Sequence, residues 1–351
     1  MQWPAMSGAR DSISIAFVRQ AAAAVARLGG DPTPLLARAG IAPLLLESDA
    51  ARVTPESFGS LWLSIAASLD DEFFGLDSRR MKVGSFSALC HLTLGSVSLR
   101  EALRRMRHFF NILLDDTVVH LESDVAETTM LLVSRCPPDS AGQARMVFAQ
   151  ETLLVMIHGV LCWLAGRRIP ICRARFAHPR PDWWPEYELI FCADLGFGAE
   201  ETRIVLGSRY LDAPVVQTRA SIKSFLRGAP ANFILKYRDE QSLAARVRRQ
   251  LRDLAPDDWP TQSDLAKELK LGVSTLHRKL DREGTSFQAI KDAIRRDLAI
   301  RLLTVSEMSI GEIAAMAGFA ETSAFRRAFK LWTGVPPSAL RVVSAQQKPD
   351  L

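Results

Sequence analysis

The sequence lacks the short motifs that mark common catalytic sites. It contains no G-x-S-x-G, no H-E-x-x-H and no phosphate-binding P-loop. Its first ten residues, MQWPAMSGAR, have neither the charged start nor the apolar core of a signal peptide. The longest apolar run, 153–165, contains His158 and is shorter than a membrane-spanning helix. We therefore expect no enzymatic activity and no membrane association, and we expect this run to form a buried core helix.

Metal-binding and disulfide patterns are also missing. The five cysteines, at positions 90, 136, 162, 172 and 192, include no C-x-x-C pair. An odd number of cysteines, without an export signal, indicates reduced thiols and a cytoplasmic protein. We expect buried, unreactive thiols, no metal and no cofactor.

The 351 residues are enough for two or three domains, and their charge is unevenly distributed. A hydrophobic content of 48% with a mean hydropathy of +0.05 indicates a folded, soluble chain. Residues 246–341 contain 17 Lys and Arg against 12 Asp and Glu, whereas residues 1–245 contain 26 of each. The excess positive charge therefore belongs to the C-terminal third, as binding to nucleic-acid phosphates requires.

Residues 309–341 have the pattern of a helix-turn-helix. Apolar residues at 310, 313, 314 and 317 predict one short helix, and Gly318 then allows a turn with positive φ. The next helix starts near Glu321 and directs Phe325 and Phe329 inward. Thr322, Arg326, Arg327 and Lys330 are then left to face outward. A second helix with outward cations is the geometry that enters a DNA major groove.

Residues 264–280 repeat this pattern upstream. Leu265, Ala266 and Leu269 predict the inner face of a first helix, and Leu276 and Leu280 that of a second. Lys270 stands where the later copy has Gly318, which predicts a slightly different turn. A long amphipathic helix is expected between the copies, over 287–304, and an arginine-rich helix before them, over 242–254.

The later copy resembles the second helix-turn-helix of the AraC/XylS family of bacterial transcription regulators. The family pattern is matched at twelve positions: Ile313, Ala314, Gly318, Phe319, Ser323, Phe325, Arg327, Phe329, Lys330, Gly334, Pro337 and Arg341. An unrelated helical hairpin remains the alternative. The resemblance covers about residues 240–342.

The resemblance implies a transcription activator. Its expected partners are double-stranded promoter DNA, RNA polymerase, a small-molecule effector and a second copy of the chain. It places Ser274, His277 and Arg278 of the first copy against DNA bases. From the second copy it places Thr322, Arg326, Arg327 and Lys330 at the DNA. Arg is able to read guanine with two hydrogen bonds, although either Arg326 or Arg327 could instead hold a phosphate.

The N-terminal region predicts an α+β domain. Helical periodicity covers 13–29, 54–69, 84–94 and 98–113, followed by strand-like stretches at 117–121, 128–134, 171–176 and 202–206. A long helix over 142–165 is expected to pack on a small antiparallel sheet. The fold class is therefore mainly α, with an α+β effector domain followed by an all-α DNA-binding domain.

Residues 173–215 resemble the N-terminal domain of the ornithine-utilisation subgroup of the same family, which lacks a cupin barrel. Phe176, His178, Pro181, Tyr187, Phe191, Phe197 and Pro214 match its pattern. If this domain binds an effector, Phe176, His178, Trp183, Tyr187 and Phe197, and also Trp184, are candidates to line the effector pocket. Each has a structural alternative: the aromatic residues could be core, and His178 a turn residue with a satisfied hydrogen bond.

We expect an effector and dimerisation domain over 1–212, a linker over 213–238, the DNA-binding domain over 239–342 and a flexible tail over 343–351. An enzyme or a purely protein-interacting module fused to a DNA-binding domain is the alternative function. A DNA-repair methyltransferase of that kind needs a reactive cysteine in a PCHR-like setting, and none of the five cysteines has one.

Overall fold

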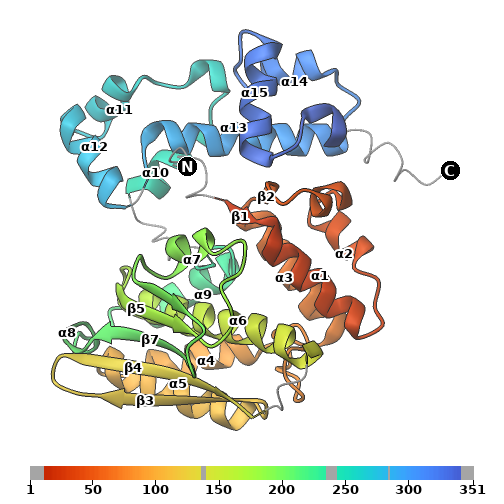
Figure 1. Cartoon of the computed structure of the whole chain (residues 1–351). Helices are drawn as coiled ribbons and strands as arrows, with labels where there is room; N and C mark the ends of the chain where they lie inside the picture. The colour runs from red at the N-terminus through yellow and green to blue at the C-terminus, as the bar shows by residue number, and fades with distance from the viewer. Residues whose placement is uncertain (1–11, 136–139, 235–242, 284, 341–351) are drawn as a thin grey trace. The chain divides into compact units, whose positions relative to one another are not determined.

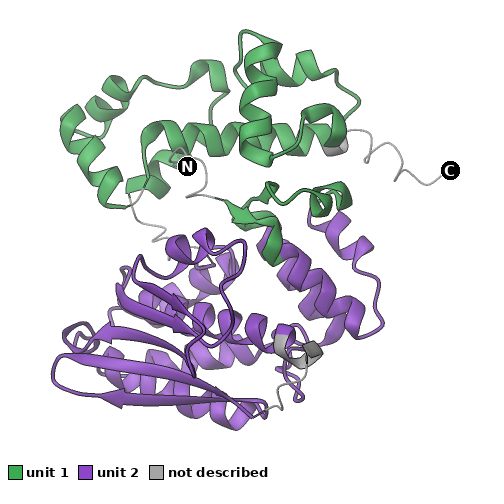
Figure 2. Cartoon of the chain, in the orientation of Figure 1, with its two compact units in different colours: residues 1–17, 40–57, 238–351 green, residues 18–39, 58–237 purple. Residues whose placement is uncertain are grey.

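The computed structural model describes residues 12–135, 140–234, 243–283 and 285–340, and the chain is divided into two compact units (Figure 2). Unit 1 comprises residues 1–17, 40–57 and 238–351, and unit 2 comprises residues 18–39 and 58–237. Unit 1 therefore includes a segment from the N-terminal region that the expected division at residue 212 placed in the other domain. Arg341, Cys136 and the expected tail 343–351 lie outside the described residues.

The sheet of unit 2 has five strands in the order β3-β4-β7-β5-β6 (Figure 1). The strands are β3 (Thr117–Ser123), β4 (Glu127–Ser134), β5 (Ile171–Phe176), β6 (Leu195–Phe197) and β7 (Thr202–Gly207). Most neighbours are antiparallel, as expected, but β6 runs parallel to β5 and pairs Phe197 with Phe176. The mixed sheet and the helices around it confirm the α+β class of this region.

The expected helices form within one or two residues of the predicted limits. They are α1 (Ile15–Arg27), α3 (Pro55–Leu69), α4 (Ser85–Leu94), α5 (Leu99–Leu113) and α6 (Ser140–Leu164). Shorter helices that the pattern did not predict individually are α2 (Thr33–Arg38), α8 (Ser208–Leu211) and α9 (Arg219–Gly228). Helix α7 (Pro185–Ile190) contains Tyr187, one of the residues that match the subgroup pattern. The expected linker therefore contains a helix, α9, started by the capping box of Thr218 and Ser221.

Helix α6 is the core helix of unit 2. Its segment Ala144–Leu164 is long and apolar enough to cross a membrane, but 83% of its most apolar window is buried within the fold. Leu153, Leu154 and Leu161 have no exposed surface. Burial of these side chains removes apolar area from water, which is the main favourable contribution to folding. The apolar run therefore forms a core helix, as expected.

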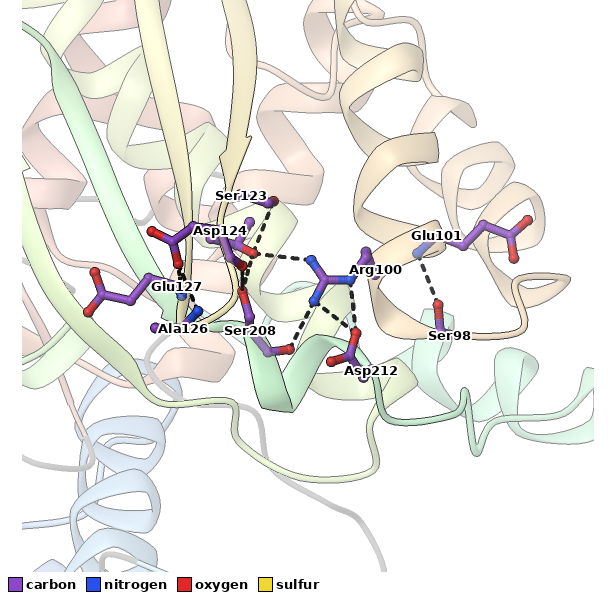
Figure 3. A network of polar contacts seen from close by, with 10 residues as sticks. Ser98, Arg100, Glu101, Ser123, Asp124, Ala126, Glu127, Ser208 and Asp212 are labelled. Atoms are coloured by element: carbon purple, nitrogen blue, oxygen red, sulfur yellow. Dashed lines mark hydrogen bonds and ion pairs between the residues drawn. The ribbon is translucent and has the colours of Figure 1, made fainter.

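A network of hydrogen bonds connects the start of α5 to one end of the sheet (Figure 3). Arg100 Nε donates to Asp212 Oδ1 over 2.9 Å, and another guanidinium nitrogen donates to the carbonyl of Ser208 over 3.2 Å. Ser208 Oγ also donates to the carbonyl of Asp124 in the β3–β4 turn and lies 3.0 Å from Thr128 Oγ1. The network thus joins α5, α8 and the β3–β4 hairpin.

Unit 1 holds the C-terminal helices: α10 (Leu243–Arg252), α11 (Gln262–Glu268), α12 (Val273–Arg282), α13 (Phe287–Val305), α14 (Ile310–Met316) and α15 (Thr322–Thr333). The short 3-10 helices η2 (Pro43–Glu47) and η3 (Pro256–Asp258) and the strand pair β1 (Ile13–Ser14) and β2 (Arg52–Val53) complete it. The described part of residues 243–340 is entirely helix and loop, which confirms the all-α class of this region.

The segment 40–57 lies against the C-terminal end of α15. Gly334 ends α15 in the left-handed conformation at φ +77°, and a Cβ there would approach the carbonyl oxygen of Ala50 to 2.6 Å. Arg252 of α10 also lies 4.0 Å from Glu56. The absence of a side chain at position 334 therefore permits the close approach of β2 to α15.

We predict that Gly318→Ala destabilises unit 1 more than Gly40→Ala. Both glycines adopt positive φ, +71° and +67°, which costs an L-residue about 1–2 kcal/mol. A Cβ at Gly318 would also lie 2.7 Å from Pro256 Cβ, whereas one at Gly40 would meet no atom within 4 Å. Urea unfolding followed by tryptophan fluorescence should show this order, and equal losses of stability would contradict the tight contact.

Candidate DNA-binding surface and effector site

The first helix-turn-helix consists of α11 and α12. Thr261 caps α11 by accepting a hydrogen bond from the Asp264 N–H, which satisfies a backbone donor that the helix leaves free. Leu265 and Ala266 of α11 pack with Leu276 and Leu280 of α12 in one buried cluster. The inner faces are therefore those predicted from the apolar spacing.

The turn between these helices has the same backbone form as that of the second copy, so the expectation of a slightly different turn is wrong. Lys270 has φ +55°, a left-handed conformation that a lysine adopts at an energetic cost. Gly272 follows and caps α12 with an extended backbone. The lysine therefore occupies the same kind of turn position as Gly318. The two copies differ in that the left-handed conformation strains the backbone of Lys270 and not that of Gly318.

The outward face of α12 carries the predicted residues. Ser274, His277 and Arg278 are exposed, while Leu276 between them is fully buried. Glu283, which follows the end of α12, accepts hydrogen bonds from the backbone N–H groups of Leu243 and Ala244 at the start of α10. A carboxylate at a helix N-terminus is favourable because of the helix dipole. This contact ties α10 to the end of α12.

The second helix-turn-helix consists of α14 and α15. Ser309 and Glu312 form a capping box at the start of α14. Phe325 and Phe329 of α15 are fully buried, and Phe319 of the turn meets Phe325 edge-to-face with 5.5 Å between ring centroids. These rings orient α15 with its opposite side outward.

That opposite side carries Arg326, Arg327 and Lys330, all exposed, together with the half-buried Thr322. In the described part of the chain, neither Arg278 of α12 nor Arg326 and Arg327 of α15 has an intramolecular ion pair or side-chain hydrogen bond. Their guanidinium donors are thus free to bind phosphates or base edges without first breaking a contact inside the protein.

Arg295 of α13 is a positioning residue that sequence reasoning missed. Its guanidinium donates to the carbonyl of Ala317 over 3.1 Å and to that of Gly318 over 3.3 Å, in the turn of the second copy. It also lies 5.1 Å from the ring centroid of Phe319 and 5.2 Å from that of Trp259, which belongs to the core of the first copy. One side chain therefore contacts both copies, and only its place on α13 in three dimensions reveals this.

Four of the predicted effector residues lie together in unit 2. Phe176 of β5 contacts the rings of His178, Tyr187 and Phe197, with centroid distances between 4.8 and 5.5 Å. Phe176, His178 and Tyr187 are buried. Trp183 is half-buried, and its indole nitrogen is buried without a hydrogen-bond partner in the described structure. Trp184 instead stacks under the guanidinium of Arg180, 3.8 Å from the ring centroid.

Glu151 of α6 completes this cluster, and sequence reasoning did not single it out. The hydroxyl of Tyr187 donates to Glu151 Oε1 and lies 3.3 Å from His178 Nε2. Burial raises the pKa of Glu151 to about 7 and lowers the pKa of His178. The signal that could have found Glu151 is its position as the one acidic residue in the sequence of α6.

Only some of the described cysteines are buried, although all were expected to be. Cys90 and Cys162 are buried, and burial raises the pKa of both thiols, that of Cys162 to about 12. Cys172 is exposed, so the expectation that it would be buried is wrong; it occupies an outward position of β5. His158 Nε2 lies 3.5 Å from Cys162 Sγ, one helical turn away on α6, and 2.7 Å from the carbonyl oxygen of Ile169.

Comparison with known proteins gives matches in both regions. Residues 29–215 match the model of the arabinose-binding domain of AraC transcription regulators, N-terminal, and residues 265–342 match a helix-turn-helix domain. The ornithine utilization regulator of Pseudomonas aeruginosa is 28% identical over 94% of this chain and 96% of its own. An uncharacterized HTH-type transcriptional regulator of Mycobacterium tuberculosis is 29% identical over 90% of this chain and 92% of its own length. The solved structure of the transcriptional regulator CdpR from Pseudomonas aeruginosa is 22% identical, covers 82% of this chain and 87% of its own, and has a TM-score of 0.33.

We predict that Glu151→Gln changes the pH dependence of stability. The folded chain holds the Glu151 pKa at about 7, above the value of about 4.3 in an unfolded chain. The contribution of this carboxyl is therefore complete below pH 4.3 and is lost as the pH rises through 7. From pH 4 to pH 8, the stability of Glu151→Gln should increase relative to the parent by on the order of 3–4 kcal/mol.

The measurement is urea unfolding of both proteins at each pH, since the difference between them removes most contributions of other groups. Glu188→Gln, at an exposed position of α7, is the matched control for removing a carboxylate. A constant difference between the Glu151→Gln variant and the parent across this range would contradict the buried, raised carboxyl.

Proposed function

Because the chain belongs to the AraC family of bacterial transcription regulators, with an N-terminal domain of the arabinose-binding type, we propose that it is a sequence-specific regulator controlled by a small-molecule effector. The observation that carries the proposal is the pair of helices α12 and α15. Each buries its apolar side and directs outward arginines that have no partner in the described part of the chain. Such a family member acts on transcription, and the alternative of an enzymatic N-terminal domain has no support in the family it matches.

The proposed contacts divide between the two helices. Ser274, His277 and Arg278 of α12 face one stretch of major groove, and Thr322, Arg326, Arg327 and Lys330 of α15 face the next. Helix α13 connects them with 19 residues, a length of about 28 Å at the helical rise. Half-sites on one face of DNA lie about 34–36 Å apart, a comparable distance. The contacts of Arg295 with both copies support a fixed orientation of α15 relative to α12.

The proposed partners follow from this role. The chain acts in the cytoplasm as a homodimer, binds double-stranded promoter DNA and activates RNA polymerase there. The name of the relative from Pseudomonas aeruginosa associates that protein with ornithine utilization. For this chain we propose a small-molecule effector in unit 2, since this unit contains most of the region that matches an arabinose-binding-type domain.

We also propose that residues 239–342 form an independently folding DNA-binding domain. The buried residues in the core of the first copy lie between Ala244 and Ile290, and Leu243 and Ile294 pack against them. The second copy has its own aromatic core of Phe319, Phe325, Phe329 and Trp332. The contacts with segment 40–57 add to these cores without forming them.

We predict that Arg278→Ala and Arg327→Ala each weaken binding to the operator by about 1–3 kcal/mol and relax base preference at one position. The operator is first obtained by selection from random duplexes, and binding is then measured by fluorescence anisotropy. Arg107→Ala, at an exposed position of α5, is the control and should bind as the parent does. Equal affinity of the parent for operator and scrambled DNA would refute sequence-specific binding.

We predict that a fragment of residues 239–351 is folded and binds the same operator more weakly than the full chain. The fragment keeps both cores but loses the contact between Gly334 and Ala50 and the proposed dimer partner. Circular dichroism and anisotropy measure the two properties. An unfolded fragment would show that segment 40–57 is an essential part of this domain.

A further inference from the structure

Unit 2 contains a second candidate ligand site, separate from the predicted effector residues. It is a pocket of about 250 Å³ between α3, α4, α6 and the segment 226–233. Aromatic walls are formed by Trp62, Phe86 and Phe233, and Leu63 lies at the pocket with 55% of its surface exposed. An apolar pocket with few polar groups is the usual form of a small-molecule site, and this volume lies just below the range of drug-sized sites, roughly 300–1,000 Å³. A ligand that fits it is small.

One wall of the pocket is the segment 229–234, which is closely packed against two helices. A Cβ at Gly59 of α3 would lie 3.0 Å from Ala231 Cβ, and a Cβ at Gly159 of α6 would lie 2.6 Å from the ring of Phe233. The absence of side chains at both glycines therefore makes room for this segment. Phe233 also stacks on Phe86, with 5.3 Å between ring centroids.

Among the described residues that line the pocket, Glu72 is the only charged one. Its carboxylate accepts hydrogen bonds from the N–H groups of Gly84 and Phe86 at the start of α4, over 2.9 and 2.7 Å. Trp62 Nε1 donates to the Glu72 carbonyl oxygen over 3.0 Å, which fixes the indole as a wall. Burial raises the pKa of Glu72. A cation beside this carboxylate would offset that effect, whereas a second carboxylate would add to it.

We propose that this pocket binds a small primary amine with an apolar body, the ammonium group facing Glu72 and the body lying among Trp62, Phe86 and Phe233. Carboxylates and ammonium groups form charge-assisted hydrogen bonds, and aromatic faces attract a nearby cation. A carboxylic acid of the same size finds no basic side chain among the lining residues that the structure describes. In naming this amine as the effector, the inference rests on the proposed function.

The position of the pocket provides a route to unit 1 along the chain. Ala229, Pro230 and Phe233 line it, and the chain continues from there through residues 235–242 to α10, the first helix of the DNA-binding region. A ligand that contacts this wall favours the conformation in which the segment is held against α3 and α6. Only such a difference in affinity between two conformations is able to alter DNA binding.

The test uses the full chain and a matched panel of probes: butyl, benzyl and cyclohexylmethyl bodies, each carrying an amine, a hydroxyl or a carboxylate. Isothermal titration calorimetry measures the dissociation constant of each. For at least one body, the amine should bind roughly ten- to a hundredfold more tightly than the alcohol, and the carboxylate more weakly still. If no amine binds more tightly than the acid with the same body, the proposal is overturned.

Two variants assign the binding to this pocket. Glu72→Gln removes the charge and should abolish the preference for the amine. Leu63→Lys adds a cation at an exposed position of the wall, so it should weaken amine binding and strengthen binding of the carboxylate. Leu92→Lys, also exposed but not part of the lining, is the control and should keep the parent preference. Unchanged amine binding in Leu63→Lys overturns the assignment to this pocket.

Operator binding with and without the amine separates this inference from the proposed function. An amine that binds with the expected selectivity and also shifts operator affinity supports both. An amine that binds with that selectivity but leaves operator affinity and transcription unchanged supports the site and refutes its role as the effector site. A metabolite without an amine that shifts operator affinity, together with failure of every amine to bind, supports effector control and overturns the amine site.

Discussion

Helix α13 joins the two helix-turn-helix copies, and its Arg295 is a side chain that contacts both of them. Each copy has a small core of its own, and neither core alone determines where its recognition helix lies relative to the other. The guanidinium of Arg295 satisfies two carbonyl oxygens in the turn of the second copy and lies beside an aromatic ring from each copy. A planar, permanently charged group is able to make hydrogen bonds and ring contacts at the same time, which a lysine does less well. The geometry available for binding DNA therefore rests on a residue that does not itself face outward with the predicted DNA contacts.

The sequence predicted most elements with strong local signals. The limits of α4 and α5 follow from apolar spacing and from caps such as Ser98, and the burial of Phe325 and Phe329 follows from their separation by one helical turn. Elements made by long-range pairing were missed. Strands β1 and β2 are two residues each and pair across about 40 positions, so neither has a recognisable period. The parallel strand β6 is three residues long, and it is held in the sheet by pairing with β5, which is distant in the sequence.

The candidate sites show the same limit. Outward residues of α12 and α15 could be assigned because a family pattern and helical geometry place them. Phe176, Tyr187 and His178 were identified as aromatic positions, but their partner Glu151 comes from a helix about 36 residues away from Tyr187 in the chain. The pocket near Glu72 joins segments from residue 62 to residue 233, and helix α9, which leads to its wall, was expected to be a linker. The capping box of Thr218 and Ser221 starts a helix within that expected linker.

The contact between Glu283 and the start of α10 has a mechanical consequence. Two backbone N–H groups, at Leu243 and Ala244, are held by the carboxylate of the residue that follows α12. A pull on the chain at Leu243 would therefore act on the end of α12 through Glu283, and at the same time on the core that contains Ala244. Glu283 therefore transmits a force on the start of α10 to the end of α12.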